Sequence, residues 1–384
     1  MTDILVIGGG AAGMAAAISA KMENPRLEVV IAESKPRVGK KLLATGSGRC
    51  NLMNTLAQPE DYLGDAEFIR PALEAYRREY GEFWKYLGLE LREEEEGRVY
   101  PATNQAATVL DVLRLALSEL GIEERTDTEI DVLRPGFYAG EIRARRVILA
   151  TGGKAGKGLG ENESFARLLQ PLGHRITRVY PGLTPLKVER EQIAGLKGVR
   201  LKGSLILLDR NKLLTVEKGE ILFGEDAVSG IAAMQLSLRA AKGMRVRIKP
   251  EGRPDLSGRR DRFPHRSAEE LLTGALPKPI GRLLLKRAGI ALSKPAGSLT
   301  DIELKRIIDW EIPIIGTGDF TAAQIMRGGA DTGEFDPHTL ESRRVKGLYA
   351  CGELLDVAGP CGGYNLEWAW ASGCLAGRRA AQSL

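Results

Sequence analysis

The 384-residue sequence predicts an α/β fold in which a domain built on a parallel sheet is interrupted by a β-barrel-like insertion and a small helical subdomain. Three observations carry this prediction. At the start of the chain a short apolar run leads into a glycine-rich turn and a helix. A second apolar run ends in glycines near residue 150, and a third leads into a glycine-opened helix near the C-terminus. Between these last two, short alternating apolar segments are typical of an antiparallel sheet or a small barrel.

The first element is a strand followed by a Gly-x-Gly-x-x-Gly turn. Residues 4–7 are too few for a helix and rich in β-branched side chains, as in a buried parallel strand. Gly8 makes the tight turn, Gly10 lets a pyrophosphate approach the backbone, and Gly13 lets the next helix pack closely. The N-terminus of that helix offers free N–H groups to the phosphates. The segment therefore predicts a dinucleotide site in a Rossmann-type domain.

A second strand, residues 28–32, ends at Glu33, twenty residues after Gly13. A carboxylate at this spacing is expected to accept a hydrogen bond from a ribose hydroxyl, and it disfavours NADP because it repels a 2′-phosphate. The segment alone does not separate FAD from NAD. Residues 35–41 add three lysines and an arginine that suit the phosphates, with a solvated basic loop as the alternative.

Residues 42–54 combine glycines, small hydroxyls, one arginine and two asparagines. They fit neither a helix nor a strand, so we expect them to wrap a ligand. Cys50 lies here without a neighbouring cysteine to pair with, which favours a packed or ligand-adjacent role over redox chemistry. The four cysteines form no Cys-x-x-Cys motif, which favours a reduced cytoplasmic protein without a structural zinc.

The remaining elements follow from apolar periodicity and turn residues. In the first domain we expect helices at 65–87 and 108–120, an acidic loop at 92–97, a β region at 122–138, a strand at 145–149 and a helix at 161–172. In the insertion we expect strands at 183–188, 196–208, 212–216, 221–223, 244–248 and 312–317, a helix at 280–288, and capping boxes at Ser267/Glu270 and Thr300/Glu303. The expected domains are a discontinuous Rossmann-type domain at 1–185 and 318–384, a β-rich domain at 186–255 and 311–317, and a helical subdomain at 256–310.

The C-terminal segment carries a second glycine-opened helix. Residues 347–353 predict a strand that ends at Glu353, and Asp356 follows. Residues 362–365 then open a helix that runs to the end, so free N–H groups again face something negative. This N-terminus could face the O2 and N1 side of a flavin ring, where negative charge develops on reduction. Tyr364 could wall such a ring, whereas the two tryptophans of this helix are expected in the core.

Composition limits the function classes. An apolar content of 43%, a charged content of 27% and a net charge of +5 do not predict nucleic-acid binding. Residues 242–266 hold nine Lys or Arg against three acids, for which a solvated connector is favoured over RNA contact. No apolar run is long enough to span a bilayer, and no signal peptide is expected because the first residues enter a strand directly. Among three histidines, no metal cluster or Ser/His/Asp set stands out.

The chain resembles a known family, the BaiN/RdsA-type NAD(P)/FAD-dependent oxidoreductases, some of which are labelled aminoacetone oxidase. The resemblance rests on residues 8–13, 39–51, 150–153, 326, 328–330, 341–342, 347–356 and 362–373, which span almost the whole chain in the family's order. Two of these segments are long and specific. They are Gly-Lys-Lys-Leu-Leu-Ala-Thr-Gly-Ser-Gly-Arg-Cys-Asn at 39–51 and Gly-Gly-Tyr-Asn at 362–365.

The resemblance implies FAD bound by the N- and C-terminal parts of one Rossmann-type domain, with NAD(P)H as a transient co-substrate. It implies that residues 8–13 and Glu33 hold the ADP half and that residues 363–365 face the ring. Lys40, Lys41, Thr45 and residues 48–51 would line the flavin side. Gly352, Glu353 and Asp356 would meet the ribityl and pyrophosphate region. The expected cofactor-binding residues are Gly8, Gly10, Ala11, Ala12, Gly13, Glu33, Ser34, Lys35, Gly39, Lys40, Lys41, Thr45, Gly46, Gly48, Arg49, Cys50, Asn51, Ile130, Ala150, Thr151, Gly152, Gly352, Glu353, Asp356, Gly363, Tyr364 and Asn365.

Two stretches depart from the family pattern. After residues 221–223, relatives carry Thr-His and later Ser-Gly-Pro, where this chain has Gly224-Glu225 and Ser229-Gly230-Ile231. If that histidine reaches the substrate in relatives, the substrate or proton donor differs here. Residues 327–330, Arg-Gly-Gly-Ala, stand where relatives tend to have Thr-Ala-Gly-Gly.

The expected function is an FAD-dependent oxidoreductase that transfers a hydride between the flavin and a small organic substrate. We expect a cytoplasmic monomer or homodimer with no metal, membrane or nucleic-acid partner. Arg49, Asn51 and Tyr364 are the catalytic candidates for positioning the substrate. Only one dinucleotide motif is evident, so a nicotinamide has to bind without its own Rossmann domain, or electrons come from elsewhere.

Two alternatives stay open. One is a flavin-containing RNA-modifying or RNA-binding protein that uses residues 242–266, which predicts steep salt dependence of RNA binding. The other is a disulfide reductase that pairs Cys50 with Cys351 or Cys361, which unchanged turnover in Cys50→Ser excludes.

Overall fold

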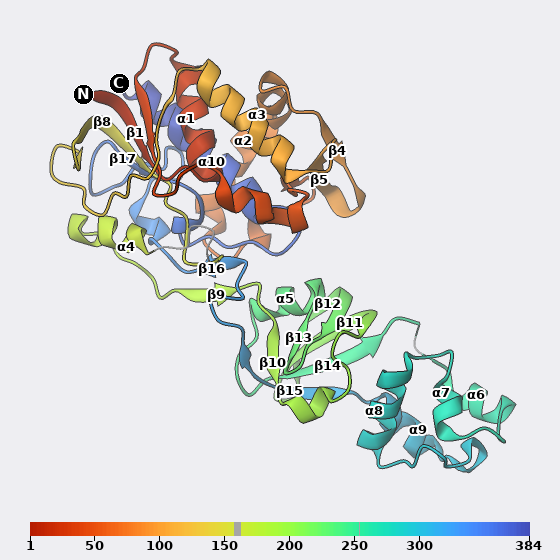
Figure 1. Ribbon diagram of the computed structural model, residues 1–384. Helices are drawn as coiled ribbons and strands as arrows, with labels where there is room; N and C mark the ends of the chain where they lie inside the picture. Colours follow the sequence, from red (N-terminus) through yellow and green to blue (C-terminus); the bar gives the residue numbers. More distant parts are fainter. Residues whose placement is uncertain (157–162, 253) are drawn as a thin grey trace. The chain divides into compact units, whose positions relative to one another are not determined.

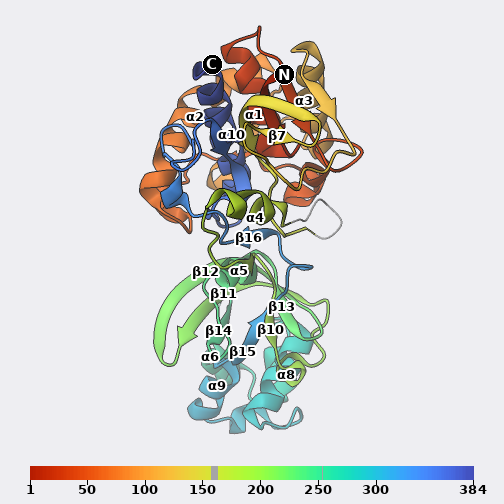
Figure 2. The ribbon, with the colours of Figure 1, turned by 90° about the vertical axis from the view of Figure 1, so that its left-hand side faces the viewer.

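A computed structural model describes residues 1–156, 163–252 and 254–384 of the protein. The chain divides into two compact units, Met1–Gly182 with Phe320–Leu384, and Leu183–Asp319. Figures 1 and 2 show the two units from two sides. The start of the helix expected at 161–172 lies outside the described residues. No helix among the described residues is long and apolar enough to cross a membrane.

The first unit is built on a parallel sheet with the strand order β17-β8-β1-β2-β6. The strands are β1 (Thr2–Ile7), β2 (Val29–Ala32), β6 (Glu123–Arg125), β8 (Ile142–Leu149) and β17 (Leu348–Ala350), and β7 (Tyr138–Ala139) pairs antiparallel with β8. In β1, Ile4 aligns with Val29 on one side and with Arg146 on the other. The carboxyl ends of the parallel strands therefore meet at one edge of the sheet.

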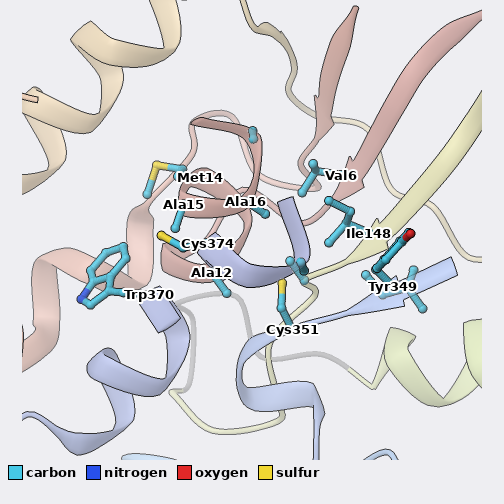
Figure 3. Packing of buried hydrophobic residues seen from close by; sticks show 14 of the residues in the cluster. Val6, Ala12, Met14, Ala15, Ala16, Ile148, Tyr349, Cys351, Trp370 and Cys374 are labelled. Atoms are coloured by element: carbon cyan, nitrogen blue, oxygen red, sulfur yellow. The ribbon is translucent and has the colours of Figure 1, made fainter. Parts of the chain in front are cut away.

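Two helices from opposite ends of the chain, α1 (Ala11–Glu23) and α10 (Tyr364–Gln382), pack against each other. Two glycines of α10 permit this approach. A Cβ on Gly373 would lie 2.4 Å from the Ala12 carbonyl oxygen, and one on Gly377 would lie 2.0 Å from that of Ala16. Figure 3 shows the buried alanines of α1 beside Cys374. This packing joins the N- and C-terminal segments into one domain.

Further helices and short sheets complete the first unit. They are α2 (Ala66–Tyr86), α3 (Ala106–Glu119), α4 (Ser164–Leu169), the sheet β3-β5-β4 (Met53–Asn54, Arg98–Pro101, Leu91–Glu93) and the pair β16-β9 (Ile325–Arg327, Tyr180–Gly182). The prediction of a loop at 92–97 is wrong at its start, because residues 91–93 form a strand that pairs with β5. The segment predicted to be neither helix nor strand contains the 3-10 helix η1 (Lys40–Gly48), with left-handed backbone at Gly46 and Ser47.

The second unit contains a closed barrel with the strand order β10-β13-β12-β11-β14-β15. Its elements are β10 (Leu186–Val188), β11 (Arg200–Asp209), β12 (Lys212–Phe223), β13 (Ala227–Ser229), α5 (Ile231–Ser237), β14 (Arg245–Pro250) and β15 (Glu311–Thr317). Residues 212–216 and 221–223 form one strand instead of the predicted two, because β11 pairs with β12 through the polar stretch between them. The predicted α/β class with a barrel-like insertion is confirmed.

Between β14 and β15 the chain forms the helices α6 (Leu256–Arg262), α7 (Ala268–Leu272), α8 (Lys278–Ala288) and α9 (Asp301–Ile308), which gather at one end of the barrel (Figure 1). Both predicted capping boxes are present, at the start of α7 and of α9. Barrel and helices share one hydrophobic core, in which Phe223 stacks on Trp310 with ring centroids 5.3 Å apart.

Candidate functional site

The loops at the carboxyl edge of the parallel sheet line a groove that is open to solvent. The groove brings together the predicted site residues Gly8, Gly10, Glu33, Ser34, Lys35, Gly39, Lys40, Lys41, Ile130, Ala150, Thr151 and Gly152. It also includes Thr128, Glu129 and Ser164, which the sequence reasoning missed. Thr128 reaches the groove because its backbone N–H donates to the Glu33 carbonyl oxygen at 2.9 Å, a contact with no signal in the sequence.

The three motif glycines have different surroundings. Gly8 has φ +107°, and a Cβ there would lie 2.4 Å from the Ala150 carbonyl oxygen. A Cβ on Gly13 would lie 1.9 Å from the Gly8 carbonyl oxygen, inside the turn itself. A Cβ on Gly10 would meet nothing within 4 Å. Gly8 and Gly13 are therefore required by the fold, whereas Gly10 leaves open space at the groove.

Glu33 is fixed at the rim of the groove by the loops around it. Its Oε2 accepts a hydrogen bond from the Gly9 N–H at 2.7 Å, and its Oε1 accepts from the Lys35 N–H at 2.8 Å. A carboxylate has about four acceptor positions. The two backbone donors thus hold Glu33 in place and leave positions for a ribose hydroxyl.

Buried polar atoms without partners lie on the two segments that flank the groove. Among the described residues, Thr151 Oγ1 after β8 and Asn51 Oδ1 after η1 are buried and have no hydrogen-bond partner. Buried polar atoms are hydrogen-bonded in the great majority of cases. Together with the space at Gly10, these two atoms fit a polar ligand that runs from the groove toward residue 51.

Predicted residues after β17 are occupied by protein contacts. Lys41 donates to Glu353 Oε2 at 2.8 Å, and the Met326 N–H donates to Glu353 Oε1 at 2.8 Å. Asp356 Oδ2 accepts from Thr177 Oγ1 at 2.8 Å. Glu353 therefore ties η1 to the loop after β17, and its carboxylate shapes the site through these contacts.

The N-terminus of α10 lies against the segment that contains Asn51. A Cβ on Gly363 would lie 2.5 Å from the Met53 carbonyl oxygen and 2.8 Å from Asn51 Oδ1. The Asn365 side chain turns back to its own loop, where it both donates to and accepts from Gly359 at 2.8 Å. The side chain of Asn365 thus stabilises the loop before α10 and is not available to bind a ligand.

The catalytic candidates differ in how free their side chains are. Arg49 is engaged: its Nη2 lies 2.6 Å from Glu94 Oε1, its Nε donates to Asn104, and its guanidinium carbon lies 4.0 Å from the Tyr100 ring centroid. Tyr364 is half-buried, and its hydroxyl makes no hydrogen bond to any residue that the structure describes. Burial raises its pKa, so the hydroxyl keeps its proton at neutral pH.

The three buried cysteines are unsuited to thiol chemistry. Cys50, Cys351 and Cys374 are buried and unpaired. Burial raises the pKa of Cys50 to about 12 and that of Cys374 to about 11, and it raises the pKa of Cys351 as well. A nucleophilic thiolate is therefore absent at these positions near neutral pH. No group of His, Cys, Asp and Glu among the described residues could hold a metal ion.

A buried histidine cluster, which sequence reasoning missed, has the residue types of a catalytic triad. His174 Nδ1 lies 2.9 Å from Glu334 Oε2, and its Nε2 lies 2.9 Å from Ser342 Oγ. The His174 ring stacks on Phe335 at 4.8 Å. Ser342 Oγ also accepts from the backbone N–H groups of residues 344 and 345, at 3.0 and 2.9 Å. With the serine buried and its oxygen already accepting, the His174 cluster is a structural network.

Comparisons with known proteins agree with this geometry. The chain matches the family described as HI0933-like protein Rossmann domain over residues 2–379. It is 38% identical to a 3-dehydro-bile acid delta(4,6)-reductase of Clostridium scindens, with 100% of both chains covered. It is 28% identical to a ribosomal RNA dihydrouridine synthase of Escherichia coli, with 96% of each chain covered.

Solved structures show the same fold at lower identity. A flavocytochrome c3 fumarate reductase in its open conformation is 16% identical, with a TM-score of 0.52 over 99% of this chain and 78% of its own. A 3-ketosteroid delta1-dehydrogenase from Sterolibacterium denitrificans is 14% identical, with a TM-score of 0.51 over 100% of both chains. With the family match over residues 2–379, the chain belongs to the HI0933-like Rossmann family.

Proposed function

We propose that the chain holds FAD along the groove and across the N-terminus of α10, and that it reduces a carbon–carbon double bond in a small organic substrate. The observation that carries this proposal is the run of unsatisfied groups at the site. Gly10 leaves open space, and Thr151 Oγ1 and Asn51 Oδ1 are buried without partners. A dinucleotide cofactor supplies phosphate and ring atoms for such groups.

The names of two relatives support the reaction class. One is a delta(4,6)-reductase of a 3-dehydro-bile acid, and the other is a dihydrouridine synthase that acts on ribosomal RNA. Both names describe the addition of two hydrogens to a carbon–carbon double bond. Bound FAD supplies the hydride chemistry of such a reduction. A small substrate is favoured because the more similar of these two relatives acts on one.

The residues of the chain bind the cofactor, orient it and provide a proton. The N–H groups that open α1 beside Gly10 bind the pyrophosphate, and Glu33 orients the ribose. Asn51 Oδ1, which has no protein partner, would accept a hydrogen bond from the ring system. Tyr364 Oη holds the proton that the second carbon of the double bond receives, since its raised pKa keeps it protonated and its hydroxyl is free.

The electron donor in this proposal is NAD(P)H, which binds transiently. The Gly-x-Gly-x-x-Gly turn lines the groove that FAD would occupy. A nicotinamide would therefore have to bind without a Rossmann domain of its own, and it would supply the electrons for the bound flavin.

RNA is the second candidate substrate, because a dihydrouridine synthase aligns with 96% of the chain. The basic stretch 242–266 gives this candidate little support. Arg247 pairs with Glu311, Arg260 pairs with Asp301 at 2.7 Å, and Arg259 donates to two backbone carbonyl oxygens. These cations are held by protein acceptors, whereas RNA binding requires cations that can contact phosphates.

The test is an absorbance spectrum of the purified protein, followed by anaerobic addition of NADH and then NADPH to the same sample. We expect a yellow protein that bleaches with one of the two donors. The reduced protein is then mixed with a 3-oxo-4,6-diene bile acid or with a uridine-containing RNA, and the return of colour is timed. Return of colour with the bile acid alone supports the small substrate, and return with RNA alone supports the second candidate. A colourless protein that FAD cannot reconstitute overturns the proposal.

A further inference from the structure

A buried ion pair behind the N-terminus of α10 takes no part in the reaction proposed above. Arg77 of α2 donates from Nε to Glu367 Oε1 at 2.7 Å, and the Glu367 side chain has no exposed surface. Glu367 Oε2 accepts from the Asn54 backbone N–H at 3.3 Å. Arg77 Nη2 is buried and has no hydrogen-bond partner among the described residues.

The pair is tied to the loop that opens α10. The Glu367 N–H donates to the Gly363 carbonyl oxygen at 2.9 Å, so the carboxylate lies on the first turn of the helix. Asn54, which donates its N–H to Glu367, also donates from Nδ2 to the Gly362 carbonyl oxygen at 3.1 Å. Gly363 in turn lies against Asn51 Oδ1, the orphaned acceptor. The two charges therefore lie beside the segment assigned to the flavin ring.

Stability alone does not account for this pair. A buried ion pair is often no more stable than apolar side chains of similar volume, because both charges lose their water. Burial raises the pKa of Glu367, and the hydrogen bond from Arg77 opposes that rise. The Arg77 guanidinium at 2.7 Å favours the charged form of the carboxylate, in a place where a charge acts through a low-dielectric interior.

We propose that Arg77 and Glu367 are positioning residues whose balanced charges set the redox potential of the flavin at the N-terminus of α10. The inference rests on the proposed function. Negative charge develops on the ring as it is reduced, so a nearby unbalanced cation favours the reduced form and an unbalanced anion disfavours it. The pair keeps the local charge neutral while it anchors the loop.

The experiment measures the flavin midpoint potential of the full chain, by reduction in the presence of a reference dye. Glu367→Gln leaves the arginine unbalanced and is expected to shift the potential positive. Arg77→Gln leaves the carboxylate unbalanced and is expected to shift it negative. The double variant restores neutrality and is expected to return close to the wild-type potential. A purely structural role predicts no such opposite signs.

A matched control joins the same two helices at the far end of α10, where Arg378 pairs with Glu79 at an exposed position. Glu79→Gln and Arg378→Gln are expected to leave the potential unchanged. Arg77→Lys keeps the charge and is expected to match the wild type. If Arg77→Gln does not fold, a positive shift in Glu367→Gln beside an unshifted Arg77→Lys supports the inference, and an unshifted Glu367→Gln overturns it. The inference is overturned if all variants have equal potentials or if the two single Gln variants shift in the same direction. In either case, flavin bound to the protein still supports the proposed function. A wild-type chain that holds no flavin overturns both.

Discussion

The groove and the His174 cluster are both built from polar side chains in the first unit, but their hydrogen bonding differs. In the His174 cluster both ring nitrogens have partners, and Ser342 Oγ accepts two backbone N–H groups besides. Thr151 Oγ1 in the groove and Asn51 Oδ1 after η1 are buried without partners. The cluster is complete without a ligand, whereas the groove is not.

Residue types alone therefore identify the wrong site. A histidine between a carboxylate and a serine is the arrangement of a hydrolase, yet here it fastens a buried loop. The described residues that line the groove include no histidine. Its proposed function depends on the open space at Gly10 and on the unpaired oxygens of Thr151 and Asn51. Unpaired buried atoms beside the open space at Gly10 distinguish the groove from the satisfied His174 cluster, because most buried polar atoms are hydrogen-bonded.

The largest effect is expected from Tyr364→Phe, which removes the unpartnered hydroxyl and keeps the ring. Loss of a proton donor costs about 100-fold to 10,000-fold in rate. In stopped-flow measurements, oxidation of the reduced flavin by substrate should slow by this amount, while flavin reduction by NAD(P)H changes little. Equal slowing of both half-reactions would contradict a proton-donor role.

Gly10→Ala tests the space at the groove. The backbone there has φ −79° and ψ −170°, which alanine adopts, and its Cβ would meet no protein atom within 4 Å. We expect the Kd for FAD to rise about 100-fold, equivalent to about 2.7 kcal/mol, with the Tm of the apoprotein unchanged. Fluorescence titration with FAD and thermal unfolding of the apoprotein measure the two quantities.

Gly13→Ala is the matched control, because its Cβ would come within 1.9 Å of the Gly8 carbonyl oxygen. This overpacking should lower the free energy of unfolding by roughly 1–3 kcal/mol. If Gly10→Ala lost as much stability as Gly13→Ala, the space at Gly10 would belong to the fold.

His174→Gln tests the other side of the comparison. It should lower the free energy of unfolding by roughly 1–3 kcal/mol, because a buried hydrogen-bonded network loses partners. The affinity for FAD should not change. Urea unfolding monitored by circular dichroism measures the first, and FAD titration measures the second. Weaker FAD binding at unchanged stability would assign the cluster to the site.

The same variant has a pH signature. Burial lowers the pKa of His174, and the hydrogen bond with Glu334 only partly offsets this. Below about pH 6.5, His174 therefore takes up a proton more readily in the unfolded chain than in the folded protein. Burial favours a higher pKa for Glu334, but hydrogen bonds from Arg344, Arg175 and His174 outweigh it and lower the pKa to about 2. Wild-type stability should therefore fall as the pH drops below about 6.5 and again below about 4.5. His174→Gln should lack the first loss and keep the second.

Much of the fold could be predicted from local signals. The strand of residues 4–7, the glycine turn and the capping boxes each depend on neighbours in sequence, and the structure contains them. The sequence analysis failed at two hairpins whose polar residues give no apolar pattern. Residues 91–93 pair with β5, and the polar middle of β12 pairs with β11.

The candidate site divides in the same way. The residues that line the groove near Gly8 and Glu33 belong to a local motif and were predicted. Thr128 reaches it only through the position of β6 beside β2, and the engagement of Arg49 by Glu94 depends on a separate sheet. Neither contact has a local signal that a single sequence could reveal.

The smallest effect is expected from substitution of the buried cysteines, because their thiols pack in the interior and need no ligand. Cys351 is fully buried, and burial raises its pKa, so it carries no thiolate to exchange with Cys50, whose own pKa is about 12. Cys351→Ala should keep turnover within about twofold and cost about 1 kcal/mol of stability, as for a small cavity. Cys50→Ser should likewise retain most of the turnover. A steady-state assay with NAD(P)H measures both variants. Loss of turnover in both, with flavin still bound, would mean that the two thiols act together and that burial does not keep them inert.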